Sequence, residues 1–184
     1  MANVAKKYAK ALFDTAKEKA LLDQMYEEFS TIDEAVRPEV GKLKELDTDP
    51  QKDVAQRQRF VAIIFGHAHQ YLQNMFMVLA SNRHLTYTHE IFLAFETLYN
   101  AYHNQDFAII ESVYELSEDE IASIDSIIRS RTKLSKLMIT NEINPDLIGG
   151  IRVKVGTKVM DASIKNDLAK LEKQFIRVKY KSKE

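Results

Sequence analysis

The sequence predicts an α+β protein, with an N-terminal all-α bundle of five to six helices followed by a small α+β C-terminal domain. Two observations support this prediction. In the first part of the chain, apolar residues recur at spacings of three and four, which is typical of amphipathic helices. After residues 103–106 they form β-branched runs or alternate with polar residues, which is typical of strands. We place the boundary near residues 104–108, and assign residues 1–105 to the bundle and residues 106–184 to the second domain.

The first two predicted helices each show a single apolar stripe. The first stripe consists of Val4, Tyr8, Ala11, Leu12, Thr15 and Ala16. The second consists of Met25, Phe29, Ile32 and Val36. The second helix ends before Pro38, because proline has no N–H to donate and its ring blocks the preceding turn. A short helical piece is expected at residues 40–46, before a turn or helix start at residues 47–50.

Three further helices complete the predicted bundle. One contains Val54, Phe60, Val61, Ile64 and Phe65. The next is apolar on much of its surface and contains Tyr71, Leu72, Met75, Phe76, Val78 and Leu79. Residues 81–84 break it, and the last helix contains Ile91, Phe92, Phe95, Leu98, Tyr99 and Tyr102. Short helices with little loop between them predict a bundle, and no internal repeat indicates a solenoid.

The second domain begins with a predicted strand at residues 108–114, which is rich in β-branched and aromatic residues. Ser117 and Glu120 have the spacing of a capping box, in which the serine caps a helix N-terminus and the glutamate bonds back to the serine. The helix that follows them has a stripe of isoleucines on one face. A strand followed by a capped helix indicates that this domain mixes both kinds of element.

The remaining elements follow the same rules. A second strand is expected at residues 137–140 and a turn at residues 144–146. Residues 151–155 alternate between apolar and basic side chains, which predicts a half-buried strand. A turn at residues 156–157 leads away from this strand. A final helix is expected from about Ser163.

Composition excludes several classes of site. The chain has no cysteine, so disulfides, thiolate zinc sites, iron–sulfur clusters and cysteine nucleophiles are excluded. Its 26 basic and 27 acidic residues leave a net charge of −1, which provides no field for a nucleic acid backbone. The most apolar stretch, residues 60–80, is interrupted by polar side chains and is too polar for a membrane span. We therefore expect a cytosolic protein with no nucleic acid partner and no direct membrane insertion.

No recognisable catalytic, cofactor or metal site occurs in the sequence. The segment before Lys158 resembles a phosphate loop only superficially, because five residues instead of four separate Gly150 from Gly156. His67 and His69 are two apart, so on a helix they point in different directions. These observations favour an interaction protein without a cofactor. They leave open a generic helical adaptor, or an enzyme whose site is built from scattered residues.

Two segments are more specific. The first is residues 8–13 (YAKALF), followed by Ala16. The second is residues 144–153 (NPDLIGGIRV), continuing through residues 159–164 (VMDASI) to two leucines at positions 168 and 171. At this separation the two segments resemble the delta subunit family of bacterial ATP synthases, whose mitochondrial relative is the oligomycin-sensitivity-conferring protein. The resemblance covers the whole chain. In two places the chain departs from the family: Ala162 replaces a usual glycine, and His84 precedes Leu85 where arginine is frequent.

The resemblance implies a non-catalytic connector of F-type ATP synthase, present in one copy per complex at the cytoplasmic face of the bacterial plasma membrane. In this family the N-terminal bundle holds the amphipathic N-terminal helix of one α subunit of the catalytic head. The C-terminal domain meets the b subunits of the peripheral stalk. The stalk thereby stops the head from turning with the rotor, so that proton-driven rotation is coupled to ATP synthesis.

The resemblance also nominates contact residues. The family's positions for the α-subunit helix match Tyr8, Ala11, Met75 and Val78, although each of them alone fits an ordinary core position equally well. For the stalk only a region can be named, the final predicted helix with Leu168, Leu171 and Phe175. Lysines lie beside these three residues and would suit an acidic stalk helix, while the simpler interpretation is a solvated helix face.

Overall fold

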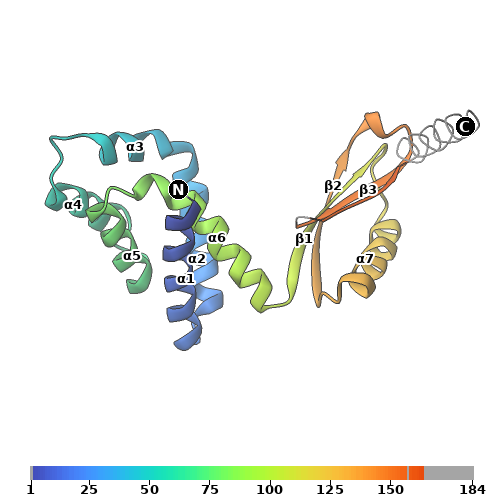
Figure 1. Cartoon of the computed structure of the whole chain (residues 1–184), viewed down its shortest axis with the longest axis horizontal. Helices are drawn as coiled ribbons and strands as arrows, with labels where there is room; N and C mark the ends of the chain where they lie inside the picture. The colour runs from blue at the N-terminus through green and yellow to red at the C-terminus, as the bar shows by residue number, and fades with distance from the viewer. Residues whose placement is uncertain (1, 157, 164–184) are drawn as a thin grey trace, which may run out of the picture. The chain divides into compact units, whose positions relative to one another are not determined.

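Of the 184 residues, the computed structural model describes residues 2–156 and 158–163. They form two compact units, which divide between Tyr102 and His103 (Figure 1). The first unit is a bundle of helices, and the second combines one helix with a mixed sheet. The predicted fold class, an all-α bundle followed by a small α+β domain, is confirmed.

The first unit contains six α-helices and two short 3-10 helices. The α-helices are α1 (Ala2–Glu18), α2 (Leu22–Val36), α3 (Val40–Thr48), α4 (Val54–Ile64), α5 (Gln70–Ser81) and α6 (Thr88–Tyr102). The 3-10 helices are η1 (Arg37–Glu39) and η2 (Leu85–Tyr87). As predicted, α2 ends before Pro38, which occupies one of the first positions of η1, where no N–H is needed.

Helix α3 extends by two residues into the segment that the sequence assigned to a turn or helix start. Its last two residues are Asp47 and Thr48. The Asp47 carboxylate is buried and accepts hydrogen bonds from the backbone N–H and the hydroxyl of Thr86, both at 2.8 Å. These long-range bonds favour two further helical residues at the end of α3, and local sequence cannot reveal them.

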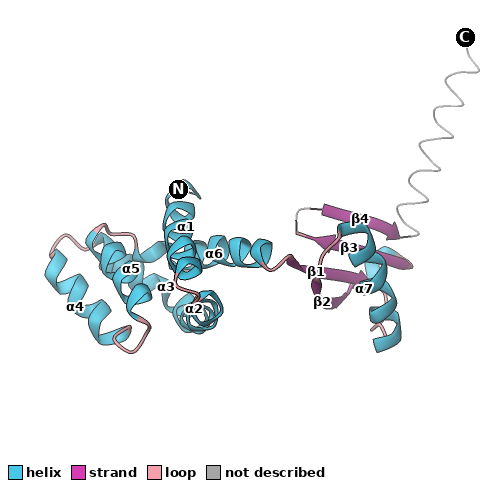
Figure 2. Ribbon diagram, turned by 90° about the horizontal axis from the view of Figure 1, so that it is seen from below, coloured by secondary structure: helices cyan, strands magenta, loops and turns pink. Residues whose placement is uncertain are grey.

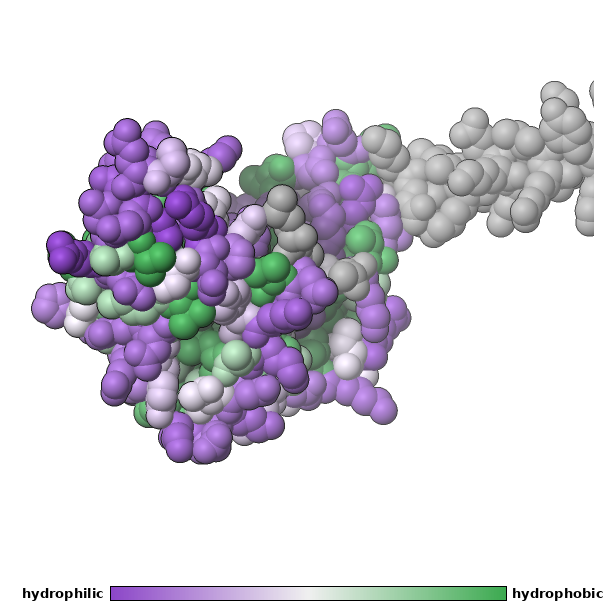
Figure 3. Space-filling view, turned by 60° about the vertical axis from the view of Figure 1, so that its left-hand side comes forward, coloured by the Kyte–Doolittle hydropathy of each residue, from purple (hydrophilic) through white to green (hydrophobic). Residues whose placement is uncertain are grey.

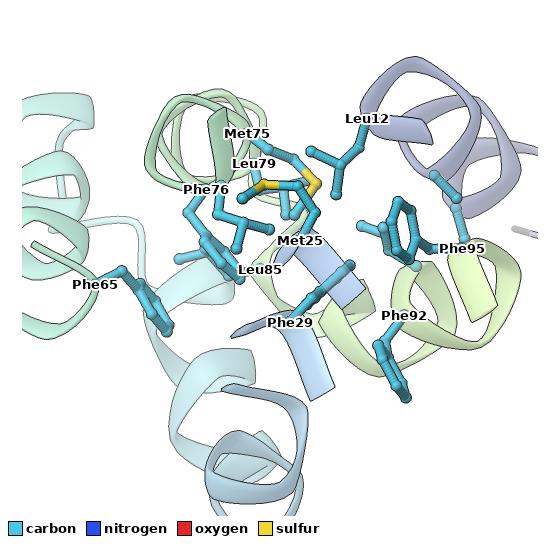
Figure 4. Close-up of a cluster of buried hydrophobic side chains, with 14 of the residues drawn as sticks. Leu12, Met25, Phe29, Phe65, Met75, Phe76, Leu79, Leu85, Phe92 and Phe95 are labelled. Carbon is cyan, nitrogen blue, oxygen red and sulfur yellow. The ribbon is translucent and has the colours of Figure 1, made fainter. Parts of the chain in front are cut away.

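Aromatic side chains of α2, α5 and α6 meet at the centre of the bundle (Figure 4). The ring of Phe29 lies 5.3 Å from that of Phe92 and 6.1 Å from that of Phe76, edge to face in both pairs. From the other side, Leu12 of α1 and Met75 of α5 point toward this cluster. Burying such rings stabilises the unit, at about 25 cal/mol for each Å² of apolar surface removed from water.

The second unit contains β1 (Gln105–Ser112), α7 (Glu118–Thr132), β2 (Lys136–Ile143), β3 (Gly150–Val155) and β4 (Lys158–Ser163), with a short 3-10 helix η3 (Pro145–Leu147). The strand order is β2-β1-β3-β4. Strands β1 and β2 are parallel and are joined by α7, whereas β3 pairs antiparallel with both β1 and β4. Helix α7 packs against one face of the sheet (Figure 2).

Helix α7 begins with the predicted capping box. The Ser117 hydroxyl accepts a hydrogen bond from the Glu120 N–H, and the Glu120 carboxylate accepts one from the Ser117 N–H at 2.9 Å. The apolar side chains of α7 then cover Ala108, Ile110 and Val153 of the sheet. Ile121, Ile124 and Ile128 of the predicted stripe therefore pack against the strands, whereas Ile127 is 55% exposed and points away from them.

Strand β4 was not predicted, because the sequence analysis assigned no element to residues 158–162, between the turn at residues 156–157 and a helix from about Ser163. Residues 158–163 instead pair with β3, with Met160 opposite Val153 and Asp161 opposite Arg152. The hydrogen-bonding partners of β4 therefore come from β3, while the sequence of residues 158–163 shows only weak alternation of apolar and polar residues. Ser163 is the last residue of β4, and the helix expected after it lies outside the described residues.

In the described part of the chain, no helix combines the length and apolar character needed to span a membrane. Among the same residues, no group of three or more histidine or carboxylate side chains is arranged to hold a metal ion.

Candidate functional site

The four residues nominated for the α-subunit contact line one groove between α1 and α5. The groove has a volume of about 330 Å³. Its lining comes from Tyr8, Ala11, Leu12 and Thr15 of α1 and from Tyr71, Asn74, Met75 and Val78 of α5. Tyr8, Ala11, Met75 and Val78 are therefore brought together in space, although more than sixty positions of sequence separate the two residues of α1 from the two residues of α5.

The lining residues follow one face of each helix, because their spacings are three and four. Each helix contributes about two turns, so the groove is roughly 10 Å long at 1.5 Å per residue. Leu12 and Met75 are 5% and 8% exposed and form the floor. Val78 is 47% exposed, and Ala11 is also exposed. Met75 thus belongs to the core, whereas Ala11 and Val78 present small or apolar side chains outward.

The turn after α5 lies beside the groove, where it contacts the lining residue Tyr8. The Arg83 backbone is left-handed, with φ of 59°. The His84 N–H donates to the Leu79 carbonyl at 2.9 Å, and the Arg83 N–H points back to the Ala80 carbonyl at 3.5 Å. This double return to the last turn of a helix is a Schellman motif, which reverses the chain and satisfies helical carbonyl groups.

The residues of this turn have different partners. The Arg83 guanidinium donates to the carbonyl oxygens of Asp47 and Asp49, at 2.6 and 3.1 Å, and so joins the end of α5 to the end of α3. His84, which stands where arginine is frequent in relatives, instead faces α1: its Nδ1 lies 3.3 Å from the Tyr8 hydroxyl oxygen. The Asn82 amide donates to the same oxygen at 3.2 Å.

A second apolar groove lies between α2, α3 and α4, and the sequence analysis did not find it. Its volume is about 410 Å³, and its apolar lining consists of Ile32, Ala35, Val36, Leu43, Phe60, Ile64 and Phe65. Beside it Ile63 is 80% exposed and Ile64 is 49% exposed. Figure 3 shows apolar side chains on an exposed face of this unit, between hydrophilic ones. The consecutive isoleucines at 63 and 64 do not by themselves signal this groove, because neighbouring residues such as Met75 and Phe76 are both buried in the core.

In the second unit, the segment that carries the family resemblance forms one polar network on the sheet. Glu111 of β1 is 4% exposed. Its carboxylate accepts hydrogen bonds from Asn144 at 2.8 Å and from Arg152 at 3.2 Å, and it forms an ion pair with Lys154. The bonds from Lys154 and Asn144 hold the pKa of Glu111 below its ordinary value. This network joins β1, β3 and the turn after β2.

The network continues onto β4. Arg152 also donates to Asp161 at 3.0 Å. Asp161 in turn accepts from the hydroxyl of Ser163 at 2.6 Å and from its N–H at 3.0 Å, and these bonds lower the pKa of Asp161. The conspicuous polar residues of the segment therefore hold the sheet together. The glycine-rich stretch also forms a strand rather than a phosphate-binding loop, because Gly150 begins β3 and Gly156 follows its last residue.

The stalk-contact residues nominated from the sequence, Leu168, Leu171 and Phe175, lie outside the described residues. Within the described part of the second unit, a shallower groove runs between α7 and β2. It includes Ile121, Ala122, Leu137 and Ile139, with charged side chains at its rim.

Comparison with known proteins gives matches along almost the whole chain. Residues 4–175 match the family model described as ATP synthase delta (OSCP) subunit. ATP synthase subunit delta of Staphylococcus saprophyticus is 74% identical over 179 residues, which are 97% of this chain and 100% of the relative. ATP synthase subunit delta of Staphylococcus carnosus is 55% identical over the same shares of both chains.

A solved structure with the same fold is a chain of the Toxoplasma gondii mitochondrial ATP synthase hexamer, determined by cryo-electron microscopy. The TM-score is 0.71, and the match covers 94% of this chain and 97% of that chain. At 16% sequence identity this likeness shows the fold alone.

Proposed function

This chain belongs to the ATP synthase delta (OSCP) subunit family, and from that membership we propose that it connects the catalytic head of an F-type ATP synthase to the peripheral stalk. Family membership makes it a structural subunit of the stator rather than an enzyme. The two other possibilities, an unrelated adaptor and an enzyme with scattered site residues, are thereby excluded. The finer proposal concerns which surfaces make the connection.

The α1–α5 groove receives the amphipathic N-terminal helix of one α subunit. The observation that supports this is the convergence of Tyr8, Ala11, Met75 and Val78 on a single apolar groove. A helix lying in a groove needs small residues where the backbones approach and larger apolar residues that grip it. Ala11 meets the first need, and Tyr8, Met75 and Val78 meet the second.

The groove suits a guest with about two turns of apolar face. Guest side chains at i, i+3, i+4 and i+7 cover that length and would contact both walls. The connection has to withstand torque without covalent chemistry, so several buried anchors should each contribute about 2 kcal/mol or more. Residues such as Met75 adapt their shape readily, which helps a groove to grip side chains of a partner.

The second unit contacts the b subunits of the stalk at the cytoplasmic face of the plasma membrane, with one copy of this chain in each complex. The support for this part comes from family membership, and the named residues Leu168, Leu171 and Phe175 remain a proposal. Connecting both partners through one chain raises the effective concentration of each contact for the other. The head is then held still while the rotor turns, so that rotation drives ATP synthesis.

Calorimetry with a synthetic α-subunit N-terminal peptide tests the groove. We compare Val78→Asp with Ile64→Asp, because both residues are about half exposed on helices but lie in different grooves. We expect Val78→Asp to weaken peptide binding at least tenfold, about 1.4 kcal/mol, while Ile64→Asp leaves it unchanged. Equal effects of the two substitutions would contradict the assignment of the peptide to the α1–α5 groove.

A parallel titration uses catalytic head from which the native subunit has been stripped. Saturation at one chain per head, weakened by the same Val78→Asp substitution, is the expected result. If the folded chain gave no binding to either the head or the peptide, the proposed connection to the α subunit would be wrong.

A further inference from the structure

We infer that His84 and Asn82 are positioning residues, which hold Tyr8 in the conformation that the guest helix meets. We call the three residues Tyr8, Asn82 and His84 the tyrosine clasp. The inference rests on the proposed function, because it concerns residues that shape the same groove. Tyr8 lines the groove, whereas Asn82 and His84 are not among its lining residues.

The clasp holds the tip of the Tyr8 side chain. The hydroxyl oxygen of Tyr8 lies 3.3 Å from His84 Nδ1 and accepts a hydrogen bond from Asn82 Nδ2 at 3.2 Å. The rings of Tyr8 and His84 meet edge to face, with centroids 5.9 Å apart and planes at 73°. A tyrosine side chain has only two torsion angles. Fixing its hydroxyl therefore fixes the ring that forms the end of the groove.

The two partners of Tyr8 are themselves held in place. His84 follows the left-handed Arg83 in the Schellman motif, so its backbone position is set by the end of α5. Its ring also contacts that of Tyr87, with centroids 5.6 Å apart. The Asn82 amide nitrogen donates to the Val78 carbonyl at 3.0 Å as well as to Tyr8. The clasp thus ties Tyr8 on α1 to the same turn of α5 that contributes Val78 to the groove.

This arrangement prepares the groove before the guest arrives. With its hydroxyl engaged inside the chain, Tyr8 offers the apolar ring to the guest. Without the clasp, Tyr8 could rotate between rotamers, and ordering it on binding would cost free energy. A side chain that is ordered before binding avoids this cost. When that order is lost, the main effect is faster dissociation of the guest helix.

The first test examines the chain without any partner. Nuclear magnetic resonance of the full chain should show contacts between the Tyr8 and His84 rings and a single Tyr8 rotamer. His84→Phe keeps an aromatic ring but removes the nitrogen, and we expect the Tyr8 rotamers to average. His84→Asn places an acceptor near the position of Nδ1 and should restore the single rotamer. A Tyr8 conformation that is identical in the wild type and in His84→Phe would overturn the clasp.

The second test measures affinity for the α-subunit N-terminal peptide in a double-mutant cycle. His84→Phe should weaken binding about three- to tenfold, the effect of losing one hydrogen bond. The same substitution in a Tyr8→Phe background should have no further effect, because the hydroxyl it acts through is already absent. His84→Asn should recover most of the affinity. Equal losses in both backgrounds would overturn the inference, since His84 would then act independently of Tyr8.

The two tests separate this inference from the proposed function. If the wild-type chain bound no peptide, the proposed function would be overturned. The claim that the clasp prepares the groove for the α-subunit helix would be overturned with it. The Tyr8 spectra then decide the clasp alone: averaged rotamers in His84→Phe support it, and an unchanged rotamer overturns it. Unfolding curves for each variant confirm that the bundle is intact.

Discussion

Gly150, which pairs with Ser163 across β3 and β4, lies so close to the backbone of Ala162 that a Cβ atom on Gly150 would be 2.4 Å from the Ala162 carbonyl oxygen. The backbone of Gly150 is also left-handed, with φ of 75°. Both features require glycine, because side chains avoid this φ and no Cβ fits against a backbone oxygen at that distance. Ala162 itself is in extended strand conformation, so the alanine found there instead of the family's usual glycine causes no strain.

The first prediction follows from this contact. Gly150→Ala should destabilise the second unit by about 2–4 kcal/mol, through the strained backbone and the clash with β4. Gly41→Ala is the matched control, because Gly41 lies within α3 and a Cβ there would meet no atom within 4 Å. That control should be neutral or stabilise by up to about 1 kcal/mol. Hydrogen exchange of the β3 and β4 amides measures the effect of Gly150→Ala, and exchange of the α3 amides measures that of Gly41→Ala. If the β3 and β4 amides were equally protected in the two variants, the prediction would be contradicted.

The second prediction concerns acid stability. Hydrogen bonds from Lys154 and Asn144 lower the pKa of Glu111 from its ordinary value of 4.5. A lowered pKa stabilises the fold above the ordinary pKa, and this contribution is lost as the pH falls through the lowered value. The second unit should therefore lose stability below about pH 4.5. Glu111→Gln should lower stability at pH 6 and flatten the acid dependence, as measured by chemical unfolding between pH 6 and pH 3.

Part of the acid dependence should remain in Glu111→Gln, because the pKa of Asp161 is lowered as well. The control is Glu115→Gln, since Glu115 is exposed and near Glu111 in sequence. If Glu115→Gln flattened the acid dependence as much as Glu111→Gln, the network around Glu111 would not be the cause.

The third prediction concerns alkaline pH. Tyr26 and Tyr99 stack with ring centroids 4.1 Å apart, and their hydroxyls donate to Glu96 and Asp23 at 2.9 and 2.8 Å. Burial, reinforced by the bond to Asp23, raises the pKa of Tyr99 to about 12, and burial with the bond to Glu96 raises the pKa of Tyr26 further. A raised pKa stabilises the fold fully below the ordinary value of 10.0. This contribution is lost as the pH rises through the raised value.

Absorbance titration of tyrosinate tests this prediction. Of the 8 tyrosines, Tyr26 and Tyr99 should ionise late in the folded chain, together with alkaline unfolding of the bundle. Tyr26→Phe and Tyr99→Phe should each remove one late group. In denaturant all tyrosines should ionise near pH 10. If all tyrosines of the folded chain ionised together near that pH, Tyr26 and Tyr99 would not be late-ionising groups.

The fourth prediction tests why the α1–α5 groove has a small residue at position 11. Ala11→Leu keeps a good helix former at an exposed position, so the stability of the bundle should change by less than about 0.5 kcal/mol. The larger side chain would occupy the space of the guest, and peptide affinity should fall at least tenfold, about 1.4 kcal/mol. Ala55→Leu, at an exposed alanine of α4, is the control and should bind normally. Unchanged affinity in Ala11→Leu would show that the guest does not lie over position 11.

Much of the fold could be predicted because its signals are local. The apolar spacing of α1, α2, α5 and α6 reports directly which face of each helix is buried. The capping box of Ser117 and Glu120 depends on residues three apart, and the structure forms it. The sequence analysis failed where the signal is distant: α3 is extended by bonds from Thr86 to Asp47, and β4 forms because β3 lies beside it.

The α1–α5 groove likewise has features that the sequence predicted and features that only the structure revealed. From the sequence by itself, the period of the apolar residues determined the helices and the face of each one. The family resemblance nominated Tyr8, Ala11, Met75 and Val78. Only the tertiary structure decided that α1 and α5 are neighbours, and that Met75 forms the floor of their groove while Val78 is exposed. It also decided that His84 contacts Tyr8, which lies 76 positions earlier in the sequence. The physical reason is that periodicity reports the burial of a face, whereas the identity of the neighbour depends on how all six helices share one core.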